Sequence, residues 1–194
     1  MWGDRYAVLA SGSGSNLQAL IEAKIPKPTV VIADLECGAL ERARRMKIPA
    51  ETIAFEGDRA TFTASILDLA RSHGVETLVL AGFMRILGPA APRTMPNRIV
   101  NIHPSLLPAF PGRDAVSQAL AAGVKITGVT VHFVDEFVDH GPIIAQHAVP
   151  VLTDDTPESL HARIQKEEHQ LYPRVVEALL EGRLVVNGRS VTWT

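Results

Sequence analysis

The stretch Tyr6–Ile21, YAVLASGSGSNLQALI, decides the fold of this chain. It starts with a short run of apolar residues, which is typical of a strand buried on both faces of a sheet. A loop rich in glycine and serine follows, and then Leu17, Leu20 and Ile21 recur at the spacing of one helix face. A buried strand, a tight loop and a helix form the first unit of an open α/β sheet.

The same alternation continues through the first half of the chain. Phe62, Ile66, Leu69 and Ala70 repeat the helical spacing farther along. Short β-branched runs lie between the helical segments, at Tyr6–Ala10, Thr29–Ala33, Thr52–Ala54, Thr77–Ala81 and Arg98–Ile102. Because such strands are joined by right-handed crossovers, the pattern predicts an α/β fold with a mostly parallel, twisted sheet and helices on both faces.

The second half of the chain has longer strand-like runs. Thr127–Val134 and Pro142–Val151 continue the sheet, and their direction is left open between parallel and antiparallel. A long helix is expected after Thr156, which is a good N-cap, and Pro173 should kink this helix or split it in two. Two short runs around Asn187-Gly188 then predict a small terminal hairpin.

Composition favours a single domain over residues 1–194. The chain is 46% hydrophobic with a formal net charge of -2, so it can bury a core and lacks the basic surface of a nucleic-acid-binding protein. No apolar run approaches the roughly 20 residues of a membrane span, and Met1–Tyr6 is unlike a signal peptide. Cys37 is the only cysteine, which excludes an intrachain disulfide and a cysteine-based zinc site. We therefore expect a cytoplasmic protein that binds no nucleic acid and no membrane.

The loop Ser11–Asn16 has the composition of a phosphate-binding turn. Glycines let the backbone approach a ligand closely, and the start of the following helix offers free N–H groups. The spacing is not the dinucleotide fingerprint, because Leu17 stands where the third glycine is needed, and the Gly-Lys pair of a Walker loop is missing. A plain turn that caps the helix fits the same residues, so spacing alone leaves both interpretations open.

Asn101 and His103 lie two residues apart at the end of a predicted strand. Side chains at this separation point to the same side, and ligands of open α/β sheets bind beyond the carboxyl ends of strands. Asp139 lies in a polar loop between two later strands, where its carboxylate could approach the imidazole and favour its charged form. Together these side chains could hold an oxyanion and move protons, as acyl transfer requires, although a histidine with a structural partner is the alternative.

Other kinds of site fit the sequence less well. The seven histidines are scattered without the spacing of zinc ligands, so no metal is expected. The G-x-S-x-G turn of serine hydrolases is missing as well. His161 and His169 are expected to be surface or capping groups on the long helix. Phe83, Met84 and Phe110 fit a role in the core unless a planar ligand stacks near them.

Several motifs together give the sequence a specific resemblance. They are SGSGSNLQAL (11–20), GALERAR (38–44), LAGFMRIL (80–87), NIHPSLLP (101–108), GVTVHFVDEFVDHGPIIAQ (128–146) and EEHQLYP (167–173). On these motifs the chain resembles the phosphoribosylglycinamide formyltransferase family, folate-dependent enzymes of purine synthesis, from about Tyr6 to Leu184. NIHPSLLP alone is shared with other folate formyltransferases. The resemblance implies the Rossmann-like formyltransferase fold, with a phosphoribosyl-substrate half at 1–100 and a catalytic and folate-binding half at 101–194.

The resemblance also implies roles for single residues. The residues that match the catalytic set are Asn101, His103 and Asp139. Those that match the site of the phosphoribosyl substrate are Gly12, Ser13, Gly14, Ser15, Asn16 and Glu168. Those that match the folate site are Arg59, Met84, Arg85, Ile86, Leu87 and Asn101, and the loop 135–139 resembles the one that closes over the pterin.

The implied reaction needs two small molecules and no metal. The amine of phosphoribosylglycinamide attacks the formyl carbon of 10-formyltetrahydrofolate directly, so no enzyme nucleophile takes part. Asn101 and protonated His103 stabilise the developing alkoxide. Asp139, through a water molecule, helps to move the proton of the amine to the departing folate nitrogen. A homodimer remains open as the oligomeric state.

A few positions depart from the family pattern. Ala109 stands where many members carry a basic residue, Arg113-Asp114 replaces a histidine-containing stretch, and Ala33-Asp34 replaces Ser-Asn. Arg113 could restore a positive charge near the substrate phosphate, and an ordinary solvated charge is the alternative. These changes concern substrate contacts and leave the expected reaction unchanged.

Three other functions are alternatives to this reaction. A methionyl-tRNA formyltransferase is expected to carry a further RNA-binding domain and a basic surface. A formyltetrahydrofolate hydrolase is expected to carry a regulatory domain before a catalytic sheet that here starts at Arg5. A non-catalytic phosphate-sensing module would not need Asn101, His103 and Asp139.

Overall fold

The structure, a computed structural model, describes residues 5–194, and its main sheet has seven strands in the order β3-β2-β1-β4-β5-β6-β7. The strands are β1 (Tyr6–Ala10), β2 (Val30–Ala33), β3 (Ala50–Thr52), β4 (Thr77–Leu80), β5 (Ile99–His103), β6 (Ile126–Phe133) and β7 (Ile143–Pro150). Strands β1 to β5 are parallel, and β6 and β7 are antiparallel to their neighbours. The predicted mostly parallel sheet is confirmed. The prediction that Met1–Tyr6 is unlike a signal peptide rests in part on Met1–Asp4, which lie outside the described residues.

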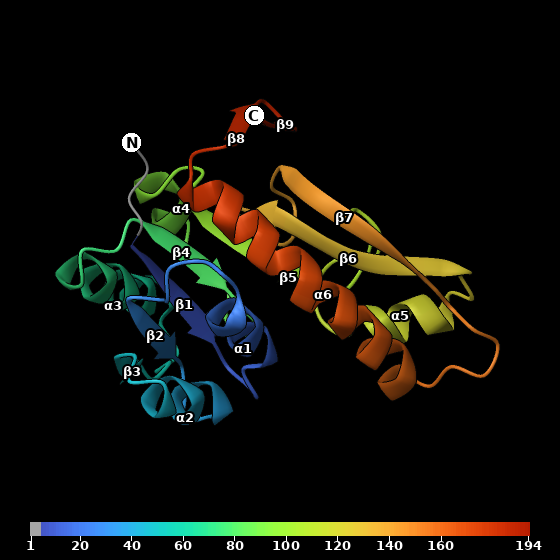
Figure 1. The fold of residues 1–194 in the computed structure, drawn as a ribbon, viewed down its shortest axis with the longest axis horizontal. Coiled ribbons are helices and arrows are strands. Elements are labelled where there is room, and N and C mark those ends of the chain that lie inside the picture. Colours follow the sequence, from blue (N-terminus) through green and yellow to red (C-terminus); the bar gives the residue numbers. More distant parts are fainter. Residues whose placement is uncertain (1–4) are drawn as a thin grey trace.

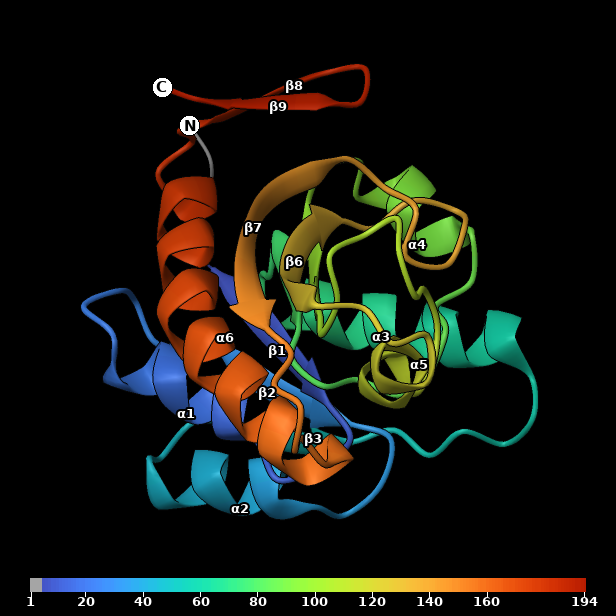
Figure 2. The same ribbon diagram turned by 90° about the vertical axis from the view of Figure 1, so that its right-hand side faces the viewer.

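Helices cover both faces of this sheet, as predicted. Within β1, Tyr6, Val8 and Ala10 face one core, and Ala7 and Leu9 face the other. The first core is covered by α1 (Ser15–Glu22), α2 (Gly38–Arg45) and α6 (Pro157–Leu180), with α5 (Ala115–Ala121) at its edge. The second is covered by α3 (Arg59–Ser72) and α4 (Ala90–Thr94). Helix α6 runs across one face of the sheet (Figure 1), and in the perpendicular view α3 and α4 lie on the opposite side (Figure 2).

Helix α6 begins where its capping residues require. The Thr156 hydroxyl accepts the N–H of Ser159, and the Ser159 hydroxyl accepts the N–H of Thr156, which completes a capping box. The helix then continues without a break from Pro157 to Leu180, so the expectation that Pro173 splits it is wrong. Pro173 is buried, and packing of the helix against the sheet outweighs the loss of one backbone hydrogen bond.

The chain ends in the predicted hairpin of β8 (Leu184–Asn187) and β9 (Ser190–Trp193). This hairpin lies beyond the C-terminal end of α6 (Figure 1). Most strand boundaries differ from prediction by one residue, and β3 differs by two, because it covers Ala50–Thr52 and not Thr52–Ala54. It is an exposed edge strand, so no buried alternation marks its limits in the sequence. Within residues 5–194, no helix combines the length and apolar character that crossing a membrane requires.

The order of the strands positions the site. Strands β1 and β4 are neighbours, but the chain continues from β1 to α1 on one face and from β4 to α4 on the other. The two connections therefore diverge beyond the carboxyl ends of these strands, which is where open α/β sheets bind ligands. The glycine-rich loop follows β1, segment 81–87 follows β4, and Asn101 and His103 end β5.

Candidate active site

The carboxyl end of β5 carries Asn101 and His103, and the loop after β6 brings Asp139 to them. His103 Nδ1 lies 3.4 Å from Asp139 Oδ2, with the two side chains only 6% and 11% exposed. Asn101 Nδ2 donates to Asp139 Oδ1 at 3.4 Å. The structure thus brings together the three side chains that the sequence analysis grouped, and it partly shields them from water, which strengthens their polar interactions.

Asp139 is held in place by backbone contacts on two sides. Its φ of 49° is left-handed, and its Oδ2 accepts the N–H of Gly112 at 2.7 Å. Farther along the loop, a Cβ on Gly141 would lie 1.9 Å from the Phe133 carbonyl oxygen, so only glycine lets the chain return this closely to β6. The loop therefore has little freedom to carry the carboxylate away from His103.

The surroundings of Asp139 keep its carboxyl group ionised. Burial raises the pKa of Asp139. The neighbouring imidazoles of His132 and His103 lower it, as does the N–H of Gly112, and the net pKa lies below the usual value. A negative charge is therefore fixed beside the imidazoles at neutral pH.

Both ring nitrogens of His103 face oxygen acceptors. Nε2 lies 2.8 Å from the Phe110 carbonyl oxygen, which can only accept, so Nε2 carries a hydrogen. Nδ1 faces the Asp139 carboxylate, which is also an acceptor. Each ring nitrogen of His103 thus lies beside an oxygen that can accept a hydrogen bond from it.

His132 is a fourth member of this cluster, and the sequence analysis missed it. The antiparallel register of β5 and β6 places His132 opposite Asn101, and its side chain is 2% exposed. Its Nδ1 donates to the Phe133 carbonyl at 2.8 Å, so in the neutral ring Nε2 accepts from Asn101 Nδ2 at 3.2 Å. A signal was present in the sequence, since Thr130 and His132 are polar at alternate positions between the apolar residues Val129, Val131 and Phe133.

Side chains at the start of α1, directly after the glycine-rich loop, form hydrogen bonds with side chains of α6. Asn16 Nδ2 donates to Glu168 Oε2 at 2.8 Å, and both residues are buried. Gln165, which the sequence analysis missed, donates to the Ser15 hydroxyl at 3.1 Å. Within the described residues, Asn16 Oδ1 is buried without a hydrogen-bond partner, and the first N–H groups of α1 have no acceptor inside the helix. The site thus offers two hydrogen-bond acceptors, Asn16 Oδ1 and the Glu168 carboxylate, beside the N-terminus of α1. Free N–H groups at a helix N-terminus favour the binding of an anion.

Segment 84–87 has two faces. Met84 and Ile86 are 58% and 54% exposed, so the alternative of a core role for Met84 is wrong, whereas Leu87 packs against the second core. The Arg85 side chain turns away and pairs with the buried Asp34 at 2.6 Å. The Met84 N–H donates to the Ser11 hydroxyl at 2.9 Å, which couples this segment to the glycine-rich loop.

Two further residues lie apart from the cluster. Arg59 begins α3 and is exposed, and in the part of the chain that the structure describes no hydrogen bond links its side chain to the cluster. His169 is partly exposed on α6, and its Nε2 is buried without a partner among residues 5–194.

Comparisons with known proteins identify the family of this chain. The family model for formyl transferases matches residues 4–176. A phosphoribosylglycinamide formyltransferase of Bacillus subtilis is 44% identical over 186 residues, which are 91% of this chain and 94% of that protein. The crystal structure of glycinamide ribonucleotide transformylase 1 from Symbiobacterium toebii has a TM-score of 0.94 at 48% identity and covers 97% of this chain and 93% of its own.

A second kind of enzyme shares the fold. The crystal structure of a formyltetrahydrofolate deformylase from Pseudomonas syringae has a TM-score of 0.92 at 28% identity, and the match covers 98% of this chain but 66% of that one. The higher identity and the near-complete coverage of both partners occur with the transferases. The chain therefore belongs to the formyl transferases, in the phosphoribosylglycinamide formyltransferase family.

Proposed function

We propose that this protein transfers a formyl group from 10-formyltetrahydrofolate to the amine of 5-phosphoribosylglycinamide, in the purine pathway that leads to IMP. The products are formylglycinamide ribonucleotide and tetrahydrofolate. The observation that carries this proposal is the meeting of Asn101, His103 and Asp139 at the end of β5, beside a glycine-rich loop. The relatives of this chain that carry formyltransferase names support it.

The phosphoribosyl substrate fits between α1 and α6. Its phosphate lies at the N-terminus of α1, where Gly12, Ser13, Gly14 and Ser15 provide N–H and hydroxyl donors without side-chain bulk. The ribose hydroxyls donate to Glu168 and to Asn16 Oδ1, which has no partner within the described residues. These contacts direct the glycinamide amine toward the end of β5.

The folate fits on the opposite side of the cluster. Met84 and Ile86 present exposed apolar surface for its pterin ring, with Leu87 behind them and the loop 135–139 as a cover. In this proposal Arg85 keeps its side chain on Asp34 and contacts the folate through its backbone, while Arg59 reaches the glutamate end. In this proposal both parts of the chain, 1–100 and 101–194, therefore contribute contacts to each substrate near the reacting atoms.

The chemistry needs donors at the formyl oxygen and a path for one proton. The amine nitrogen forms a bond to the formyl carbon, and the oxygen becomes an alkoxide that Asn101 Nδ2 and His103 Nδ1 stabilise. His103 Nε2 donates to the Phe110 carbonyl at 2.8 Å, whereas His103 Nδ1 and Asn101 Nδ2 lie 3.4 Å from the Asp139 oxygens, so these two donors are the ones that turn to the alkoxide. Asp139 keeps His103 charged and, through a water molecule, moves the amine proton to the folate nitrogen as the carbon–nitrogen bond to the folate breaks.

One incubation separates this function from the alternatives. The protein is mixed with 10-formyltetrahydrofolate, with and without phosphoribosylglycinamide, and both tetrahydrofolate and formylated product are measured. Product only when both substrates are present supports the transferase. Formate and tetrahydrofolate without the ribonucleotide would identify a deformylase, which is the second candidate because a deformylase shares the fold.

A further inference from the structure

Helix α2 packs against the glycine-rich loop backbone to backbone. A Cβ on Gly14, whose φ is +75°, would lie 2.7 Å from the Cα atom of Ala39. A Cβ on Gly38 would lie 3.0 Å from the Ser13 carbonyl oxygen. Gly14 is required for this approach, and Gly38 leaves little room for a side chain, so the N-terminal end of α2 acts as a rigid support for the loop.

Two consecutive carbonyl groups of the loop are turned toward this support. The Gly12 carbonyl accepts the N–H of Ala39 at 3.1 Å. The Ser13 carbonyl accepts Nε of Arg42 at 2.8 Å. A carbonyl oxygen that pointed into the proposed phosphate site would repel the anion. Holding both carbonyls on α2 therefore leaves the donor side of the loop facing the substrate.

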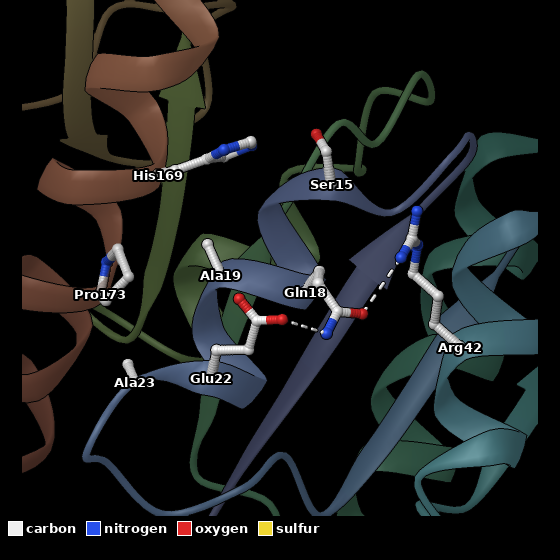
Figure 3. A pocket seen from close by; sticks show the side chains of 8 residues that line it. All are labelled: Ser15, Gln18, Ala19, Glu22, Ala23, Arg42, His169 and Pro173. Atoms are coloured by element: carbon white, nitrogen blue, oxygen red, sulfur yellow. Dashed lines mark hydrogen bonds between the residues drawn. The ribbon is translucent and has the colours of Figure 1, made fainter.

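The Arg42 guanidinium makes a second contact, with α1. Its Nη1 donates to Gln18 Oε1 at 3.1 Å, and Gln18 Nε2 donates to Glu22 Oε1 at 2.7 Å. Figure 3 shows this chain of side chains along one side of a pocket of about 540 Å³ between α1, α2 and α6. One planar group thus fixes both the loop carbonyl and the first helical turns that follow the loop, which a lysine ammonium could not reproduce in the same geometry.

We infer that Arg42 is a positioning residue for the phosphate of the ribonucleotide substrate. The inference rests on the proposed function, because it assigns the substrate phosphate to this loop. Arg42 acts by locking the Ser13 carbonyl and α1 in register, so that the loop N–H groups are aligned before the phosphate arrives. Its charge also attracts the anion, but this attraction is screened because the side chain is partly exposed.

The test compares Arg42→Ala with a control on the same helix. Arg45 is exposed and loses the same charge when changed to Ala, so Arg45→Ala separates loop support from a general charge effect. In Arg42→Ala we expect KM for phosphoribosylglycinamide to rise about tenfold, as for the loss of a hydrogen bond from a charged group. The kcat and the KM for folate should stay within about twofold of wild type. The inhibition constant of inorganic phosphate should rise by the same factor as KM, and Arg45→Ala should leave all of these values unchanged.

Other outcomes would overturn the inference. An unchanged KM in Arg42→Ala removes Arg42 from the site, and an equal rise in Arg45→Ala reduces it to a bulk charge. Arg42→Lys keeps the charge and is expected to recover only part of the affinity, so full recovery would contradict the role of the planar group. Should Arg42→Ala not fold, KM for phosphoribosylglycinamide is measured in Arg42→Lys and Arg42→Gln and compared with that of Arg45→Ala.

The failure of this inference can be told apart from that of the proposed function. If wild-type protein transfers formyl groups but Arg42→Ala has a normal KM, only the inference is wrong. If wild-type protein transfers no formyl group, equilibrium binding of inorganic phosphate still tests Arg42. Weaker phosphate binding by Arg42→Ala than by Arg45→Ala then supports its role, and equal binding contradicts it.

Discussion

His103 Nδ1 and Asp139 Oδ2 face each other across 3.4 Å, although one residue ends β5 and the other lies in the loop after β6. The second oxygen of the carboxylate accepts Asn101 Nδ2. One buried carboxylate therefore orients both groups that we assign to the formyl oxygen. This relationship makes Asp139 the most informative position for a first variant.

Asp139→Asn should lower kcat by about 100-fold or more, because it removes the charge that favours the imidazolium and the acceptor for the proton. Both KM values should change little, since Asp139 acts on the reacting atoms through His103, whereas the contacts that we assign to the phosphate, ribose and pterin come from other side chains. Steady-state kinetics with each substrate varied in turn measures this. Glu136→Gln is the control, because it removes a carboxylate from the same loop without touching His103. A near-normal kcat in Asp139→Asn would make the carboxylate structural.

The lowered pKa of Asp139 also predicts a pH dependence of stability. Because the folded-state pKa lies below the ordinary value of about 3.9, the charged carboxylate adds stability that is present above that value and is lost as the pH falls through the folded pKa. Wild type should therefore lose more of its free energy of unfolding than Asp139→Asn between about pH 5 and about pH 3. Urea unfolding at a series of pH values measures the difference, with the exposed Asp154 changed to Asn as control. Parallel curves for wild type and Asp139→Asn would contradict it.

His132→Ala should reduce kcat by about 10- to 100-fold, because Asn101 loses the acceptor that orients its amide. His132→Gln offers an oxygen near the position of Nε2, so it should retain more activity than His132→Ala. His147→Ala removes an exposed histidine that pairs with Glu167 and should have no effect on kcat. Thermal melting of each variant shows how much of the loss is due to unfolding. Equal activity in the Ala and Gln variants would count against the orienting role.

Gly14→Ala should destabilise the protein and raise KM for the ribonucleotide, because its Cβ meets backbone atoms of Ala39 and its φ is left-handed. Gly12→Ala is the matched control for stability, since a Cβ there meets nothing within 4 Å and its φ is not left-handed. We expect Gly14→Ala to cost about 1 to 3 kcal/mol in the free energy of unfolding and Gly12→Ala to cost almost nothing. If both variants melted alike, α2 would not constrain the loop.

Arg189→Ala should lower kcat about two- to fivefold, as for the loss of exposed contacts worth up to about 1 kcal/mol. Arg189 lies in the terminal hairpin and donates to the carbonyl of His140, the residue after Asp139, at 2.8 Å. Its loss should loosen the loop, which amide hydrogen exchange at residues 135–141 would detect. Arg183→Ala, which removes an arginine that pairs with Glu181, should leave the exchange unchanged. Equal exchange in the two variants would remove Arg189 from the support of the loop.

Much of the fold follows from local sequence. The apolar run Tyr6–Ala10 forms the predicted strand, because five buried residues in a row fit only a position covered on both faces. Thr156 begins the long helix and Asn187-Gly188 turns the hairpin, since a cap and a turn depend on neighbouring residues alone. The grouping of Asn101 with His103 also follows from their spacing on one strand.

Tertiary structure alone decided the contacts between distant segments. His132 joins the cluster because the register of β6 against β5 places it opposite Asn101, and the sequence does not specify register between strands so far apart. Gln165 and Glu168 contact Ser15 and Asn16 at the start of α1 because α6 packs against α1. The uninterrupted course of α6 through Pro173 depends on the same packing. Sequence periodicity reports which face of an element is buried. Which residues of two distant elements contact each other is determined only when all the elements pack together.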